Sequence, residues 1–174
     1  TDPNRVVYVN WIQNALDMAV SHGCDIVVTG VQFGGTADGE SSLSLMYDYY
    51  AYEYGLFFAT AAGNDAAQVT VFGDTYNSLT TGGLRLNHTT DIYDQIGTAS
   101  NPGPTVGSKP RRKPEAAAPS EDQWVPVNGD TLWSELGTSG GQTSYAVPHT
   151  AGIAALLLDY AIDNGISNDE KSEV

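Results

Sequence analysis

Apolar residues along this chain follow two spacings, one typical of amphipathic helices and the other of buried strands. Helical spacing predicts helices over the ranges 10–22, 42–54 and 143–160. Short apolar runs bounded by small or polar residues predict strands over the ranges 25–31, 56–61, 78–81 and 115–118. The apolar face expected on the first helix consists of Trp11, Ile12, Ala15, Leu16 and Ala19.

The predicted strands alternate with the predicted helices, which favours a mainly parallel sheet. Such sheets are covered by helices on both faces, so we expect a three-layer α/β protein. The length of 174 residues fits one domain with a substantial core. The range 84–141 is rich in loop-forming residues, and we expect hairpins and surface segments there.

The third predicted helix begins with a hydroxyl residue that could act as a nucleophile. The run TSYAVPHTAG over residues 143–152 places Ser144 in the first turn of that helix. Unpaired N–H groups and the positive end of the helix dipole favour an oxyanion formed there. This geometry suits acyl transfer, whereas the ordinary alternative is a serine that only caps the helix.

A second candidate, Asn64, follows the apolar run LFFATAAG over residues 56–63. An asparagine at the end of a buried strand can direct its NH₂ group at a developing oxyanion, and Gly63 lets backbone and substrate approach closely. Taken alone, a Gly-Asn pair is more often a turn than a catalytic amide.

The serine run resembles the active-serine signature of the subtilisin-like serine proteases, Gly-Thr-Ser-x-Ala-x-Pro-His. Residues 142–149 match it, except that Gln142 stands where the family has glycine. The resemblance implies that Ser144 is the nucleophile. Residues 137–139 also spell Gly-Thr-Ser, but the rest of the signature does not follow, so Ser139 is not the candidate.

The asparagine run resembles the Ala-Ala-Gly-Asn stretch of the same family. The resemblance implies that Asn64 donates to the oxyanion. It also implies that a short wall of the pocket for the residue before the scissile bond is formed by Ala61, Ala62 and Gly63.

Residues 27–35 resemble the family's substrate-binding edge, a strand followed by paired glycines. The resemblance implies that an extended peptide pairs with Gln32, Phe33 and Gly34 by strand addition, and that Gly34 leaves room for the side chain entering the main pocket. Two further stretches, each a Pro/Gly loop when taken singly, match family motifs in the same order. They are 100–105 and 113–119.

The sedolisins, relatives that act in acid, are a weaker match. They carry aspartate at the oxyanion position and lack the histidine after the proline, whereas this chain has Asn64 and His149. The subtilisin-like resemblance is therefore preferred.

No histidine matches the general base of the family, in which Asp, His and Ser follow one another along the chain. The only histidines are His22, His88 and His149, and His149 is too far down the helix for its ring to return to Ser144. We therefore expect a partial subtilisin-like peptidase domain over residues 1–174, with the N-terminal half missing. Uncovered apolar surface should then favour self-association unless that half is supplied.

The formal charge of −14 argues against nucleic acid and anionic membranes as partners, because both need a basic surface. No transmembrane run is expected. The single cysteine, Cys24, excludes an internal disulfide, and its place beside an apolar strand predicts a buried thiol. No metal site is predicted and no cofactor is required, although structural calcium is possible. Carboxylates that could hold calcium, without dedicated spacing, are Asp38, Glu40, Asp91 and Asp94.

These observations predict a serine endopeptidase that hydrolyses polypeptide substrates through an acyl-enzyme on Ser144 and that is inactive without the missing half. The alternative is a non-catalytic module that binds extended peptides or has a structural role. An extracellular or cell-envelope location is expected from the family resemblance.

Overall fold

The computed structural model describes residues 3–126, 133–136 and 141–166. Within these residues the helices are α1 (Pro3–Ser21), α2 (Ser42–Tyr54) and α3 (Thr143–Asp163). The strands are β1 (Ile26–Thr29), β2 (Phe57–Ala61), β3 (Ser78–Asn87), β4 (Ile92–Ile96), β5 (Ala116–Pro119), β6 (Gln123–Pro126) and β7 (Trp133–Leu136). Every predicted helix and strand is present.

The main sheet has five strands and is mainly parallel, as the alternation of helices and strands predicted. β1 pairs with β2, β2 with β3, and β3 with β5, all in parallel. The fifth strand, β4, follows β3 in a hairpin and pairs with the C-terminal end of β3 in the antiparallel direction. A second, two-stranded sheet pairs β6 with β7. The loop-rich range 84–141 therefore contains the expected hairpins.

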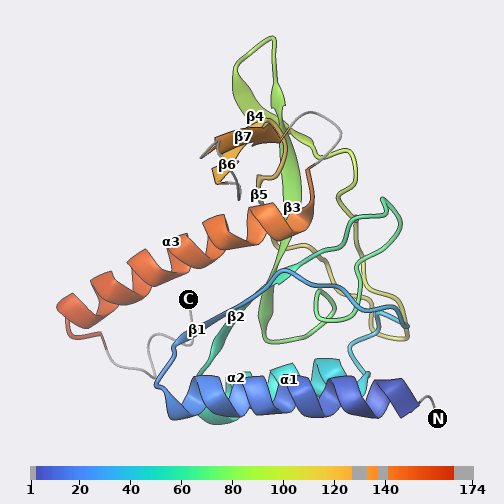
Figure 1. Ribbon diagram of the computed structural model, residues 1–174, viewed down its shortest axis with the longest axis vertical. Helices are drawn as coiled ribbons and strands as arrows, with labels where there is room; N and C mark the ends of the chain where they lie inside the picture. The colour runs from blue at the N-terminus through green and yellow to red at the C-terminus, as the bar shows by residue number, and fades with distance from the viewer. Residues whose placement is uncertain (1–2, 127–132, 137–140, 167–174) are drawn as a thin grey trace.

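Strand β2 shows how the helices cover the two faces of the sheet. Phe58 packs in the cluster formed with α1 and α2. Its neighbour Ala59, together with Ala61, packs instead with Val147 of α3. Because successive strand residues point to opposite faces, α1 and α2 cover one face and α3 covers the other (Figure 1). The three-layer arrangement is confirmed.

Local signals fix the ends of α2. The hydroxyl oxygen of Ser41 accepts a hydrogen bond from the backbone N–H of Ser44, which satisfies one of the free donors of the first turn. At the other end Gly55 has φ of 67° and its N–H donates to the carbonyl of Ala51. Glycine adopts this left-handed conformation without steric cost, so the helix ends there and the chain turns into β2.

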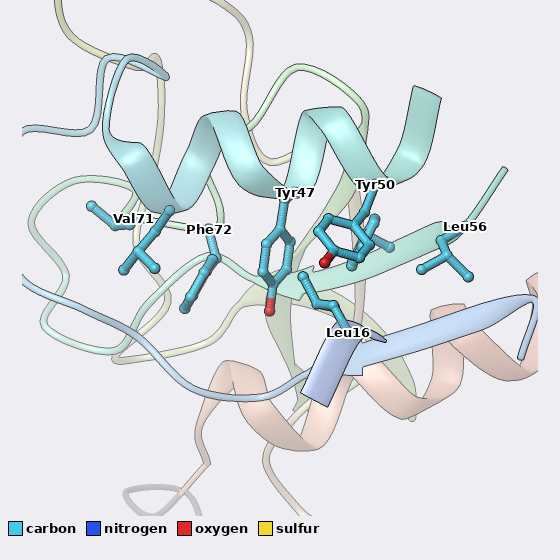
Figure 2. Close-up of a cluster of buried hydrophobic side chains, with 8 residues drawn as sticks. Leu16, Tyr47, Tyr50, Leu56, Val71 and Phe72 are labelled. Carbon is cyan, nitrogen blue, oxygen red and sulfur yellow. The ribbon is translucent and has the colours of Figure 1, made fainter. Parts of the chain in front are cut away.

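The largest apolar cluster lies between α2 and the sheet (Figure 2). The Tyr47 ring lies 4.4 Å from the Phe58 ring and 4.4 Å from the Phe72 ring, measured between centroids. Its hydroxyl lies 3.0 Å from Oγ1 of Thr29. Burial raises the pKa of Tyr47, because the phenolate would lose its hydration. This packing fixes β1 and β2 relative to α2, and the candidate site lies just beyond both strands.

Tyr50 in the same cluster gives a pH-dependent prediction. Burial, and then the hydrogen bond that its hydroxyl donates to Asp17, raise the pKa of Tyr50 from 10.0 to about 12. Since the folded-state pKa lies above the unfolded value, the stabilisation is complete below pH 10 and is lost as the pH rises towards 12. We expect thermal melts of the full-length gene product to show a steeper fall in Tm over this interval than melts of its Tyr50→Phe variant. Equal slopes would contradict this.

Three local expectations change. Helix α1 begins at Pro3, before the predicted start, and on its apolar face Leu16 is buried while Trp11 is 63% exposed. The thiol of Cys24 is exposed, so the prediction of a buried cysteine is wrong. The residue lies in the turn between α1 and β1, so neither the helix nor the sheet buries its side chain.

Helix α3 is long and apolar enough to cross a membrane by length and composition, and it is the one such helix among the described residues. In the fold it packs across β1, β2, β3 and β5, which accounts for its apolar inner face. Its outer face is also apolar and is exposed at Ile153, Leu156, Leu157 and Tyr160.

Candidate active site

The candidate site lies where three segments meet: the loop after β1, the loop after β2 and the first turn of α3. The carboxyl ends of parallel strands lie at the same edge of a sheet, so the first two loops are neighbours. Gly30, just after β1, lies directly against the helix start. A Cβ built on Gly30 would lie 3.2 Å from Cβ of Ser144, closer than most real Cβ contacts. A side chain at position 30 would therefore push against Ser144.

The amide of Asn64 is attached to the helix start by its oxygen. Oδ1 accepts hydrogen bonds from the backbone N–H of Thr143, at 2.6 Å, and from the Thr143 hydroxyl, at 2.9 Å. The N-cap residue Gln142 makes no side-chain capping bond, so Asn64 caps α3 from another part of the chain. Because the oxygen is held, the NH₂ group must point away from Thr143.

Ser144 follows Thr143 and is half-buried. Within the described part of the chain, neither its hydroxyl nor its backbone N–H has a hydrogen-bond partner. Pro148, four residues on, has no N–H to offer to the Ser144 carbonyl. The Ser144 N–H and the Asn64 NH₂ are thus two donors on adjacent segments that have no partner among the residues the structure describes.

The loop that carries Asn64 is held from both sides. Gly63 has φ of +114°, and a Cβ there would overlap the Asn101 side chain, so only glycine fits. The Gly63 N–H donates to the Thr143 hydroxyl at 3.2 Å. Oδ1 of the buried Asn101 accepts from the backbone N–H of Asp65 at 2.9 Å.

The sequence by itself indicates no role for Thr143 or Asn101. Both lie within stretches that match family motifs, and this is the one signal in the sequence that points to them. Asn101 bonds to Asp65, 36 positions away along the chain, and Thr143 bonds to Asn64, 79 positions away. Only the fold brings such pairs together.

The predicted peptide-binding edge follows β1. Gln32 and Gly34 are exposed, and a Cβ at Gly34 would meet no atom within 4 Å. Phe33 is half-buried, makes an isolated antiparallel bridge to Val71, and packs edge-on against Phe72 with 5.3 Å between ring centroids. Gln32 reaches Asn64: its Oε1 accepts from the Asn64 backbone N–H at 3.0 Å. The edge and the Asn64 loop are therefore adjacent.

The predicted pocket wall is buried. Ala61 is 2% and Ala62 0% exposed, and Gly63 is buried as well. Ala62 is bonded on both sides, through its N–H to Thr81 and through its carbonyl to Thr70. In this structure Ala61 packs with Val147 of α3, and the Gly63 N–H bonds to Thr143 at the start of that helix. Contact of the three residues with substrate stays a prediction.

All three histidines of the chain have partners other than Ser144. Nδ1 of His22 lies 2.8 Å from the carbonyl oxygen of Met18 at the end of α1. His88 lies in the hairpin between β3 and β4, with Nε2 3.6 Å from Oδ2 of Asp122. Nε2 of His149 lies 2.9 Å from Oε1 of Gln123 in β6. The general base for Ser144 is not found among them.

The four carboxylates that could hold calcium lie in two different parts of the chain. Asp38 and Glu40 lie in the loop before α2, where Oδ1 of Asp38 accepts from the Glu40 N–H at 2.9 Å. Asp91 and Asp94 lie in the β3–β4 hairpin region. In the part of the chain that the structure describes, no three His, Cys, Asp or Glu residues gather as metal ligands. A structural calcium ion stays a prediction.

The fold and site together are those of an α/β protein with a serine at a helix N-terminus beside a strand-end asparagine. The sequence profile of the Subtilase family, Peptidase S8, matches residues 2–173. This chain therefore belongs to the subtilase family, whose members are serine peptidases.

One known relative and several solved structures are similar to this chain at low sequence identity. Pyrolysin of Pyrococcus furiosus is 24% identical over 182 residues, which cover 89% of this chain and 12% of pyrolysin. The PatG macrocyclase in complex with peptide superposes with a TM-score of 0.71 at 21% identity, over 92% of this chain and 44% of that one. For the self-cleaved protease domain of PatA the TM-score is 0.69 at 21% identity, over 90% and 54%. The chain thus spans about half the length of these structures, and the likeness to them concerns the fold.

Proposed function

We propose that this chain carries the nucleophile and the oxyanion donors of a serine endopeptidase. Ser144 attacks a peptide carbonyl, and the tetrahedral oxyanion is held by the Asn64 NH₂ group and the Ser144 backbone N–H. Collapse of this intermediate breaks the peptide C–N bond, and the amine leaves with the proton that the base took from Ser144, which gives the acyl-enzyme. Water then hydrolyses the acyl-enzyme and restores the Ser144 hydroxyl. No cofactor enters this sequence of steps.

One observation carries the proposal. The Asn64 oxygen is held by Thr143, the residue before Ser144, while the Asn64 NH₂ and the Ser144 N–H lack partners among the described residues. Donors that are fixed before the reaction stabilise developing charge without reorganising, which is the requirement for an oxyanion hole. The capping alternative finds no support, because the N-cap residue of α3 is Gln142 and the Ser144 hydroxyl makes no capping bond among the described residues.

The base and its orienting carboxylate are proposed to come from a part of the domain outside these 174 residues. All three histidines have other partners. In the described sheet, β1 pairs only with β2, so its other edge is open to a further strand. Beside that edge Val28 and Val31 are 49% and 57% exposed. A location outside the cell or in its envelope remains a family expectation for this protein.

Active-site labelling tests the function. The full-length gene product is treated with a fluorophosphonate at neutral pH, and the modified peptide is located by mass spectrometry. We expect one adduct, on Ser144, and none in the Ser144→Ala variant. Ser139, which lies outside the described residues, is the internal control. An adduct on Ser139 would contradict the assignment, and no adduct at all would favour the non-catalytic peptide-binding module.

The isolated 174-residue chain should show no appreciable turnover of peptide substrates, because a serine without a base is a poor nucleophile at neutral pH. The purified chain is assayed against a fluorogenic peptide beside the full-length gene product. Turnover that Ser144→Ala abolishes would show that the base lies within this chain.

The same sample reports on self-association, which we propose from the exposed apolar side chains on α3 and the open edge of β1. Light scattering should find oligomers or aggregates of the isolated chain. A monodisperse monomer that melts cooperatively above about 60 °C would contradict this.

A further inference from the structure

Gln32 makes a contact that its predicted role on the peptide-binding edge does not require. Its side chain crosses from the loop after β1 to the loop after β2, where Oε1 accepts from the Asn64 backbone N–H at 3.0 Å. Peptide pairing would use the backbone of this edge and not the side-chain amide. The contact therefore needs another explanation.

Asn64 lies beyond the end of β2, where hydrogen bonds of the sheet no longer fix the backbone. The last bond between the β2 segment and β3 is donated by the Ala62 N–H to the Thr81 carbonyl. Gly63 follows with φ of +114°, a conformation that glycine leaves with little steric resistance. Without Gln32, the Asn64 N–H has no acceptor in the described part of the chain. The backbone of Gly63 and of Asp65 is anchored by Thr143 and Asn101, and the Asn64 N–H between them is held by the Gln32 side chain.

Asn64 is thus held at its two ends by different elements. Thr143 of α3 holds the side-chain oxygen, and Gln32 holds the backbone nitrogen. The direction of the NH₂ group depends on both hydrogen bonds, because the side chain can turn when either its oxygen or its backbone nitrogen is released. Gly30, two residues before Gln32, lies against Ser144. The short segment 30–32 therefore contacts both the nucleophile and the residue proposed as oxyanion donor.

We propose that Gln32 is a positioning residue that orients the Asn64 amide for the transition state. The inference rests on the proposed function of Asn64. Loss of the Gln32 acceptor changes the direction of the NH₂ group, and this group interacts more strongly with the oxyanion than with the ground-state carbonyl. The substitution should therefore lower kcat and leave KM unchanged.

The test uses Gln32→Met in the full-length gene product, because methionine keeps the length of the side chain and removes the acceptor. We expect kcat to fall about five- to tenfold, the loss that follows from one hydrogen bond, with KM within about twofold. Gln13→Met, on the exposed surface of α1, is the matched control and should keep wild-type kinetics. A rise in KM with constant kcat, or no change in either, would overturn the inference.

A double-mutant cycle separates positioning from direct contact. In an Asn64→Ala background there is no amide to orient, so Gln32→Met should change kcat by less than about twofold. A further loss of the full size in that background would overturn the inference. If Gln32→Met does not fold, Gln32→Asn, which is one methylene too short, replaces it in both backgrounds.

A spectroscopic readout keeps this inference distinct from the proposed function. In protein labelled with ¹⁵N-asparagine, Gln32→Met should shift the backbone amide proton of Asn64 upfield as the hydrogen bond is lost. An unmoved signal overturns the positioning role even if Ser144→Ala abolishes activity. A moved signal in a protein whose activity survives Ser144→Ala overturns the proposed function instead.

Discussion

Replacement of Ser144 by alanine in the full-length gene product should lower kcat for peptide hydrolysis by about 10⁶-fold. That magnitude is the one known for the nucleophile of subtilisin, a member of the same family, and it is carried over to Ser144 from that enzyme. The physical reason is that Ser144 is the residue proposed to form the acyl-enzyme, and alanine has no nucleophilic atom. Activity of about 10³- to 10⁴-fold over water should remain from the oxyanion donors and binding.

The fold should tolerate this change. The Ser144 hydroxyl has no partner in the described part of the chain, so its removal leaves no polar group unpaired. Circular dichroism melts should give a Tm within about 2 °C of the wild type, because surface-type substitutions usually change stability by less than about 0.5 kcal/mol. A variant that keeps more than about a hundredth of the activity would exclude Ser144 as the nucleophile.

Replacement of Asn64 by aspartate should lower kcat by at least about 10²- to 10³-fold, again a scale known from the subtilisin oxyanion asparagine. Aspartate keeps the oxygen that accepts from the Thr143 N–H and hydroxyl. It replaces the free NH₂ group by a carboxylate oxygen that repels the oxyanion. Stopped-flow measurement of acylation with a peptide ester is the direct assay, and KM should change little.

Thr143→Val provides the matched comparison for Asn64→Asp. Valine keeps the shape and the backbone N–H of Thr143 but leaves the buried Gly63 N–H without its hydroxyl acceptor. This should cost about 1–3 kcal/mol of stability, with a smaller loss of kcat than Asn64→Asp causes. If Asn64→Asp lost stability and kept its kcat, the amide would have only a structural role.

Several elements were predictable because their signals are local. The end of α2 at Gly55 and the apolar runs that became β1 and β2 can each be derived from short stretches of sequence. The first helix shows where this fails. Leu16 is buried and Trp11 exposed on the same predicted face, since burial depends on where α2 packs against α1. Cys24 is exposed because it lies in the turn between α1 and β1 and belongs to neither element.

For this protein the sequence alone determined the order of helices and strands, the mainly parallel sheet, and the two candidates Ser144 and Asn64. It did so because propensity, periodicity and family motifs are properties of contiguous residues. Only the tertiary structure decided that Thr143 holds the Asn64 oxygen and that Gln32 holds its backbone. These contacts join residues 79 and 32 positions apart, and their geometry is fixed by how α3 and the two loops pack at the edge of the sheet.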